Sequence, residues 1–261
     1  MDTTNSKKIT SIMIILHVVL LYGCYMILQS VFDFPDILRK TTDEIFALFH
    51  QNRSSIIPTY YGFTLTGVTF ILISLFSFRA LKKTDRDLLF VAAIIGTICG
   101  LLQSFGYVRW TFLIPVLDNH FHNPALTQSG KESIELILDS FHTYVGVALG
   151  ENLGFVFQGL WTIFFSIALL KHPAFSKWIG RSGIVWGIGI LVYSLEQFGG
   201  MFLSLGIINI IVQAAWASWL IVIASIFYKM DKENETTPKP GWIVLTIAFV
   251  IFVSAAVPSL L

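Results

Sequence analysis

Seven stretches of about 20 mostly apolar residues take up most of this chain of 261 residues. A helix needs roughly 20 such residues to cross the 30 Å or so of hydrocarbon in a bilayer. Only 13% of the side chains are charged, about half of the share usual in soluble domains. The pattern predicts an all-α integral membrane protein, one polytopic domain over residues 1–261 with seven transmembrane helices. The predicted spans are residues 9–31, 57–79, 88–108, 141–170, 184–205, 207–228 and 242–260.

The division between the fifth and sixth spans rests on a short cluster of small residues. The apolar run from residue 184 to 228 is interrupted only by Gly199, Gly200, Ser204 and Gly206. As one helix it would be about 67 Å long, roughly twice the thickness of the hydrocarbon core. Two crossings joined by a tight turn are therefore expected.

Lysine and arginine residues predict the orientation, because short cytoplasmic loops retain positive charge. With seven spans, twelve of these residues fall on the side of the N-terminus and five on the other side. If the fifth and sixth spans were one helix, the division would be nine against eight. The count favours seven spans, with the N-terminus inside and the C-terminus outside.

The first span also has features of a signal peptide. Lys7 and Lys8 precede it, and the tetrapeptide that ends at Cys24 is similar to a lipoprotein cleavage site. The apolar segment of a signal peptide is about 7–15 residues long, whereas this run continues through Leu28. An uncleaved signal anchor is expected, with cleavage as the alternative.

The two longest connections, residues 32–56 and 109–140, both lie outside in this topology. Each contains apolar side chains at helical spacing, which is typical of amphipathic helices. Short helices that lie on the outer membrane surface are expected. The apolar positions are Ile37, Leu38, Ile45, Leu48 and Phe49 in the first connection, and Ile134, Leu136, Ile137 and Leu138 in the second.

Ionisable residues inside a span are costly unless they are paired, so each one is a candidate functional residue. Glu151 lies in the fourth span, Glu196 in the fifth, and Arg109 at the outer end of the third. Most intramembrane polar residues fall in the outer half of the bundle, which favours an outward-facing pocket over a continuous pore. The predicted pocket residues are Arg109, Glu151 and Glu196, supported by Gln103, Asn152 and Gln213.

Helical spacing also predicts which side of the fourth span faces this pocket. Residues four and seven positions apart share one face of an α-helix. By this rule Tyr144, Ala148, Phe155 and Gln158 lie on the same face as Glu151.

Two interpretations of the three charged residues stay open. In one, they form a buried ion-pair network that only locks the bundle, and the amide side chains join helices. In the other, Glu151 and Glu196 bind a cationic group or protons, and Arg109 binds an anionic group.

Asp118, His120 and His122 have a spacing that would suit a metal ion if a further ligand converged, and His142 is the evident candidate. The sequence has no HExxH, G-x-S-x-G or Walker A motif. We therefore assign no metal, cofactor or catalytic residue.

Cys24 and Cys99 both lie in apolar runs and offer no disulfide framework. The net charge of +1 gives no basic excess for nucleic-acid binding.

Two segments of the chain resemble a bacterial multi-pass membrane family known as domain of unknown function 4386. They are residues 103–115, QSFGYVRWTFLIP, and residues 141–170, FHTYVGVALGENLGFVFQGLWTIFFSIALL. The matching elements are the Arg109-Trp110 pair with Pro115, the blocks at 150–154 and 159–162, and Lys177-Trp178-Ile179-Gly180. Asn152 stands where the family often has histidine, which argues against a metal there. The resemblance implies this fold and a bacterial inner-membrane location, without an established activity.

The sequence thus favours a protein that binds, senses or transports a small polar or amphipathic ligand from the outer face. The alternatives are a membrane-embedded enzyme for a lipid or lipid-linked substrate, with Glu151 as general acid or base, and an accessory membrane subunit. The expected partners are membrane lipid and a small-molecule ligand, with protein partners and oligomeric state left open.

Overall fold

A computed structural model describes residues 3–81 and 84–230, and within these ranges all regular secondary structure is helical. Six helical segments are long and apolar enough to cross a membrane, so the chain is a multi-pass membrane protein. The predicted seventh span, residues 242–260, lies outside the described residues. The long helices are α1 (Thr3–Phe32), α2 (Thr42–Ala80), α3 (Arg86–Phe112), α6 (Gly154–Lys171), α7 (Lys177–Tyr193) and α8 (Gly206–Lys229).

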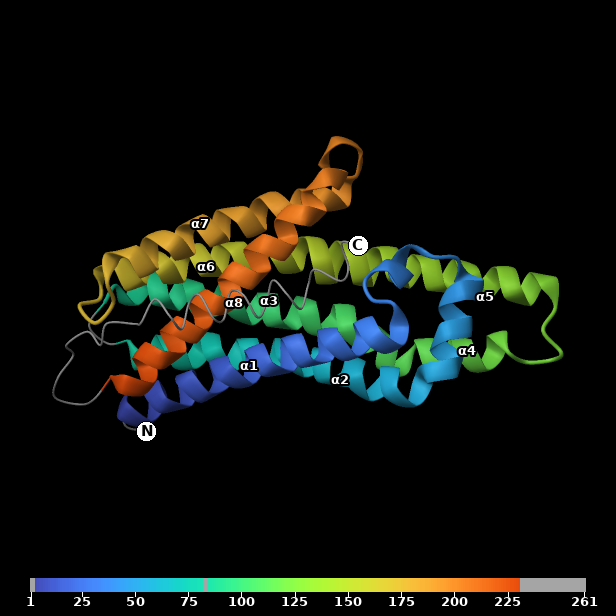
Figure 1. Cartoon of the computed structure of the whole chain (residues 1–261), viewed down its shortest axis with the longest axis horizontal. Coiled ribbons are helices and arrows are strands. Elements are labelled where there is room, and N and C mark those ends of the chain that lie inside the picture. Colours follow the sequence, from blue (N-terminus) through green and yellow to red (C-terminus); the bar gives the residue numbers. More distant parts are fainter. Residues whose placement is uncertain (1–2, 82–83, 231–261) are drawn as a thin grey trace.

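These six helices, seen lengthwise in Figure 1, form a closed ring by their contacts. Neighbours in the sequence pack side by side from α1 to α3, α3 packs on α6, and α6 packs on α7. Helix α8 closes the ring because it contacts both α7 and α1. Ser11 of α1 donates a hydrogen bond of 2.8 Å to the carbonyl of Ala224 in α8 at this closure.

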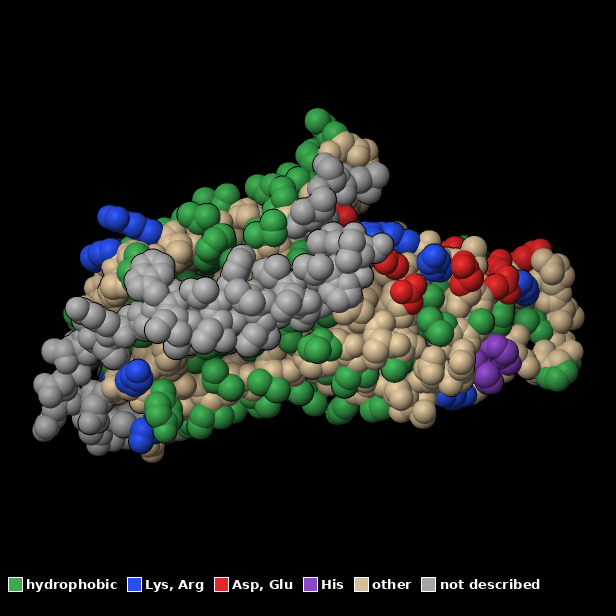
Figure 2. All heavy atoms as spheres, in the orientation of Figure 1, with side chains coloured by type: hydrophobic (Ala, Val, Ile, Leu, Met, Phe, Trp, Pro, Cys, Tyr) green, Lys and Arg blue, Asp and Glu red, His purple; other side chains and the backbone are tan. Residues whose placement is uncertain are grey.

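The outer surface of the ring is largely apolar. Side chains such as Ile15, Val19, Phe90 and Leu101 are more than two-fifths exposed. Figure 2 shows apolar side chains along the length of the bundle, whereas acidic side chains gather at the end formed by α4 (Ile114–Phe121), α5 (Gln128–Phe141) and the start of α2. We call this end the α4–α5 end. An apolar surface between charged ends is expected of a protein surrounded by lipid.

Short helices are present in residues 32–56 and 109–140, as the sequence predicted, and their position on the outer membrane surface stays a prediction. Helix α2 begins with a capping box between Thr41 and Glu44 and has a kink at Asn52, where the backbone is not helical, so residues 42–51 form a short helix ahead of the spanning part. The part after the kink, residues 53–80, is about 42 Å long at 1.5 Å per residue, which is enough to cross the hydrocarbon core. Helix α4 packs beside α2, and Lys131 of α5 forms an ion pair of 2.8 Å with Asp43 at the start of α2.

Apolar side chains of these short helices are buried against one another at the α4–α5 end, whereas Leu136 and Ile137 of α5 are exposed. Phe46 and Phe49 of α2 share a core with Trp110, Leu117 and Leu138. A second core, deeper among the spanning helices, is centred on tryptophan and phenylalanine side chains of α6 and α8.

The turn between the predicted fifth and sixth spans is present. Helix α7 is followed by two short 3-10 helices, η3 (Ser194–Phe198) and η4 (Gly200–Leu205). Gly199 and Gly200 have φ angles of 70° and 60°, a region that L side chains rarely adopt. These glycines reverse the chain and confirm that two helices occupy residues 184–228.

Candidate functional site

A cavity of about 810 Å³ lies inside the helix ring. Its volume falls in the range typical of small-molecule sites. Five of the six residues predicted to form a polar pocket line this one cavity: Arg109, Glu151, Glu196, Gln103 and Gln213.

Arg109, from the last turn of α3, is 8% exposed. One guanidinium nitrogen donates a hydrogen bond to the carbonyl of Gly106, and the other lies 3.4 Å from Nδ1 of His142. Its guanidinium carbon lies 5.6 Å from the centre of the Trp110 ring. The charge is thus held by a carbonyl, an imidazole and an aromatic ring.

The two acidic residues come from different elements. Glu151 accepts a hydrogen bond of 2.9 Å from the amide of Gln197. Glu196, which is 7% exposed, lies 3.4 Å from Nη2 of Arg39. The Arg39 side chain is 70% exposed and also lines the cavity. The cavity therefore reaches the surface beside the short helix η1 (Asp36–Arg39).

Within the part of the chain that the structure describes, neither glutamate forms an ion pair with Arg109. The three charges share one cavity but have separate partners, and of the three only Arg109 and Glu196 are buried. This arrangement differs from the ion-pair network that the sequence left open.

The segment that carries Glu151 is a π-helix, η2 (His142–Leu153). A π-helix has more residues in each turn than an α-helix and often occurs at functional sites. Its wider repeat directs His142, Gly146, Gly150 and Glu151 into the cavity. Tyr144, which α-helical spacing placed on this face, is instead 66% exposed. The predicted face was wrong for this stretch because the helix type changes there.

Three glutamine side chains form a hydrogen-bonded chain along the cavity. Gln103 of α3 donates to Gln158 of α6 at 3.4 Å, and Gln158 donates to Gln213 of α8 at 3.1 Å. The hydroxyl of Tyr22 donates to the carbonyl of Gln213 at 3.2 Å. These bonds connect four helices of the ring.

Asn152 does not line the cavity. Its amide donates a hydrogen bond of 2.8 Å to the carbonyl of Ser194, at the end of α7. The inclusion of Asn152 among the pocket residues was wrong, since the π-helical repeat turns it toward η3 instead.

Aromatic rings form much of the remaining wall. Tyr60 stacks on Trp110 with ring centres 4.9 Å apart, and Phe63 stacks on Tyr107 at 4.7 Å. The hydroxyl of Tyr60 and the amide oxygen of Asn209 are buried and have no hydrogen-bond partner among the described residues. Both residues line the cavity, so its wall contains polar groups with bonding capacity to spare.

His17 lies deeper in the cavity wall. Its Nδ1 is 3.1 Å from the carbonyl of Thr66 and 2.9 Å from the hydroxyl of Thr69. The Thr69 hydroxyl donates its own proton to the Thr66 carbonyl, so both neighbours act as acceptors toward His17. This pattern assigns the ring proton to Nδ1.

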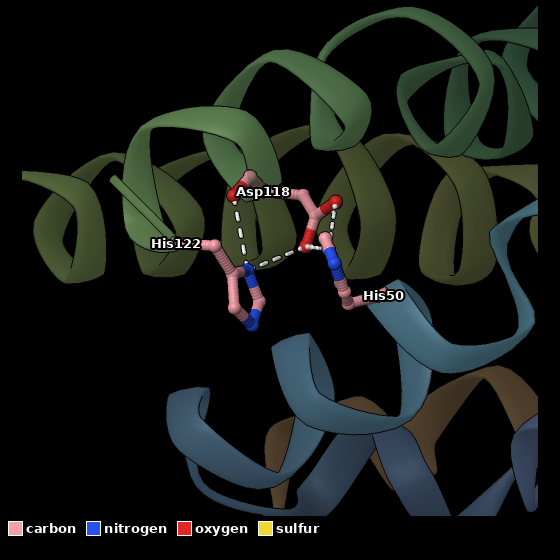
Figure 3. Close-up of side chains that lie close together, drawn as sticks. All are labelled: His50, Asp118 and His122. Atoms are coloured by element: carbon pink, nitrogen blue, oxygen red, sulfur yellow. Dashed lines mark hydrogen bonds and ion pairs between the residues drawn. The ribbon is translucent and has the colours of Figure 1, made fainter. Parts of the chain in front are cut away.

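The candidate metal ligands are only partly those that the D-x-H-x-H spacing indicated. Figure 3 shows that His50 of α2 joins Asp118 and His122. His120 is not in this group, and His142 lies beside Arg109 in the cavity.

Sequence reasoning missed His50, Arg39 and most of the aromatic wall. His50 and Asp118 are 68 positions apart, and no local motif connects them. Arg39 lies outside the apolar spans, so a search for charges inside spans passes over it.

A family model described as "Domain of unknown function (DUF4386)" matches residues 9–224. No curated protein and no solved structure gives a significant match. The match covers most of the chain, including every charged cavity residue named above, and confirms the family that the sequence motifs indicated. The chain belongs to this family of membrane proteins, the family of the domain of unknown function 4386.

Proposed function

We propose that this protein binds a small amphipathic ligand in the cavity of the helix ring, as a binding, sensing or transport protein. The observation that carries the proposal is the separation of Arg109 from both glutamates within one cavity of about 810 Å³. Arg109 and Glu151 have no ion-pair partner among the described residues, and an unpaired charge inside a membrane protein is costly. A ligand with complementary charges would offset that cost.

The lining indicates the chemistry of the ligand. Glu151 and Glu196 suit a cationic group such as an amine, and Arg109 suits an anionic group such as a carboxylate or phosphate. The stacked aromatic rings favour an apolar body between or beside these groups. A zwitterionic or cationic amphiphile fits this combination.

We place the protein in the bacterial inner membrane, with the cavity open to the outer side. The start of α1 and the α2–α3 and α6–α7 connections lie at one end of the bundle, opposite the α4–α5 end (Figure 1). Those three segments contain Lys7, Arg79, Arg86, Lys171 and Lys177. Positive charge is retained in the cytoplasm, which supports an outward-facing η1 and cavity opening.

The test is a thermal-shift screen of the full chain purified in an uncharged detergent. The panel contains primary amines, quaternary ammonium compounds and zwitterions with apolar chains of graded length. We expect members of the panel to raise the melting temperature of wild type and of Glu132→Gln. Glu132 is an exposed residue of α5 that bonds only to Gln128 among the described residues.

Glu151→Gln should remove this stabilisation, because it removes the charge that faces the ligand. No stabilisation of wild type by any member of the panel would contradict the proposal. An equal stabilisation of wild type and Glu151→Gln would also contradict it.

A further inference from the structure

A second site lies apart from the cavity, at the α4–α5 end. His50 comes from α2, and Asp118 and His122 lie on or directly after α4. Possible metal-binding atoms of these three residues all lie within 4.8 Å of one another. The side chains converge from two helices toward one point (Figure 3).

The distances suit coordination of a single ion. Nδ1 of His50 lies 3.3 Å from Oδ1 of Asp118, and Nδ1 of His122 lies 3.0 Å from the same oxygen. Ligand atoms about 2.0 Å from a tetrahedral Zn²⁺ ion are separated from one another by roughly 3.3 Å. A small adjustment of the rings would therefore place all three atoms around an ion.

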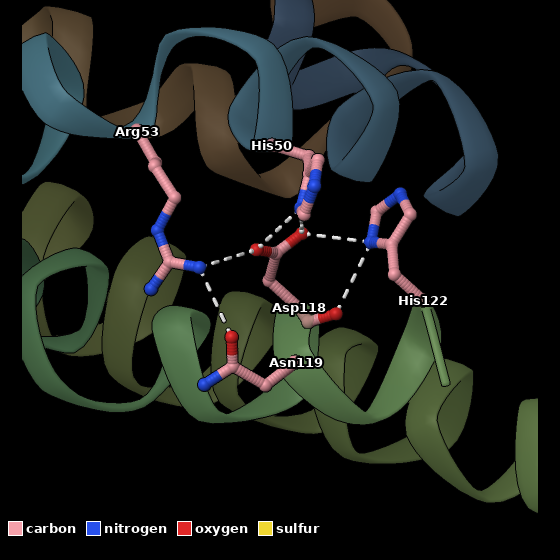
Figure 4. Close-up of polar contacts among 5 residues, drawn as sticks. All are labelled: His50, Arg53, Asp118, Asn119 and His122. Atoms are coloured by element: carbon pink, nitrogen blue, oxygen red, sulfur yellow. Dashed lines mark hydrogen bonds and ion pairs between the residues drawn. The ribbon is translucent and has the colours of Figure 1, made fainter. Parts of the chain in front are cut away.

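The surroundings of Asp118 resemble the outer shell of a metal site. Nη1 of Arg53 lies 3.4 Å from Oδ2 of Asp118 and 3.0 Å from the amide oxygen of Asn119 (Figure 4). Oδ2 of Asp118 is thus shared by Arg53 and His50, whose Nδ1 lies 3.1 Å away, while Oδ1 lies within 3.3 Å of Nδ1 of both histidines. Such supporting bonds orient the ligands of metal sites.

The solvent exposure of the three side chains also suits a metal site. Asp118 is fully buried, whereas the side chains of His50 and His122 are 49% and 35% exposed. An ion can reach the group from solvent, and water can complete the coordination. The two imidazole rings stack with centres 4.1 Å apart, which keeps both Nδ1 atoms on the side of the carboxylate.

We propose that His50, Asp118 and His122 bind a divalent transition-metal ion, with Zn²⁺ as the ion that this ligand set suits best. Two imidazoles and one carboxylate with a position left for water form a common zinc ligand set. Both rings would carry their proton on Nε2 in the bound state. The ion would fasten α2 to α4 at the α4–α5 end, independently of any ligand in the cavity.

The test uses the tag-free full chain in detergent, stripped with a chelator and then titrated with Zn²⁺. Bound metal is measured by mass spectrometry after gel filtration. We expect about one Zn²⁺ per chain. The affinity should fall about tenfold or more in His50→Ala and in His122→Ala. His120→Ala is the matched control, since His120 lies on the same helix outside the cluster, and it should bind like wild type.

Cobalt gives a readout that needs no variant. We expect Co²⁺ bound to wild type to show the intense visible absorption of a four-coordinate site, and added Zn²⁺ to remove it. Failure of wild type to bind Zn²⁺, or a Co²⁺ spectrum that is the same as that of the ion in buffer, would overturn the proposal. Unchanged affinity in both His50→Ala and His122→Ala, or equal loss in His120→Ala, would also overturn it.

Discussion

The guanidinium of Arg109 lies directly against Gly146, so that a β-carbon at position 146 would overlap it. Gly146 is in the π-helix η2, and Arg109 is at the end of α3. The contact fixes the position of the positive charge in the cavity wall. The glycine is therefore part of the candidate site although it has no side chain.

Gly146→Ala should displace Arg109 and weaken ligand binding. Overpacking a buried position costs about 1–3 kcal/mol, which outweighs the gain of roughly 1 kcal/mol from replacing a helical glycine. The measurement is the melting temperature with and without a ligand from the panel. Gly23→Ala is the control, because a β-carbon there meets nothing within 4 Å. Equal melting temperatures and equal ligand response in the two variants would contradict the account.

Gly106→Ala should destabilise the fold more than Gly146→Ala does. A β-carbon at Gly106 would lie 2.9 Å from the Cα atom of Gly150, so the backbones of α3 and η2 would have to separate. A backbone cannot move aside as the end of an arginine side chain can. Thermal unfolding of both variants in the same detergent measures the order. A smaller loss for Gly106→Ala would show that the two segments are not packed this closely.

The cavity charges were predictable because Arg109, Glu151 and Glu196 interrupt apolar runs, where each charge is costly. The predicted side of the fourth span was right for Glu151, Phe155 and Gln158 but wrong for Tyr144, since Tyr144 and Glu151 share a face only in an α-helix and residues 142–153 form a π-helix. The metal ligands were predicted only in part, because His50 reaches Asp118 through tertiary packing. Amphipathic spacing predicted the short helices in residues 32–56 and 109–140, but it did not show that their apolar side chains pack against one another.

Asp85 should make stability depend on pH in the acid range. It accepts hydrogen bonds from Lys171 at 2.8 Å and from the amide of Leu88 at the start of α3. The bond from Lys171, followed by that from Leu88, holds the pKa of the Asp85 carboxyl below its ordinary value. A carboxyl with a lowered folded pKa stabilises the protein above its unfolded pKa, about 3.9, and loses this effect as the pH falls further.

We therefore expect wild type to have a higher melting temperature than Asp85→Asn at pH 7. This difference in melting temperature should shrink as the pH falls below about 4. Asn retains the helix cap, so Asp85→Ala should melt below Asp85→Asn. If wild type and Asp85→Asn differ by the same melting temperature at pH 7 and at a pH below about 4, the ion pair does not have this role.

The most direct test of the central claim is the melting temperature of ligand-free wild type, Glu151→Gln and Glu196→Gln near pH 7. We predict that Glu151→Gln melts at or above wild type, because glutamine keeps an oxygen for Gln197 and removes an unpaired charge from the cavity. Glu196→Gln should change stability by less than about 1 kcal/mol, since its partner Arg39 is largely exposed. A loss of roughly 3 kcal/mol or more in both variants would instead show that the glutamates lock the bundle through a buried ion pair, and would contradict the account.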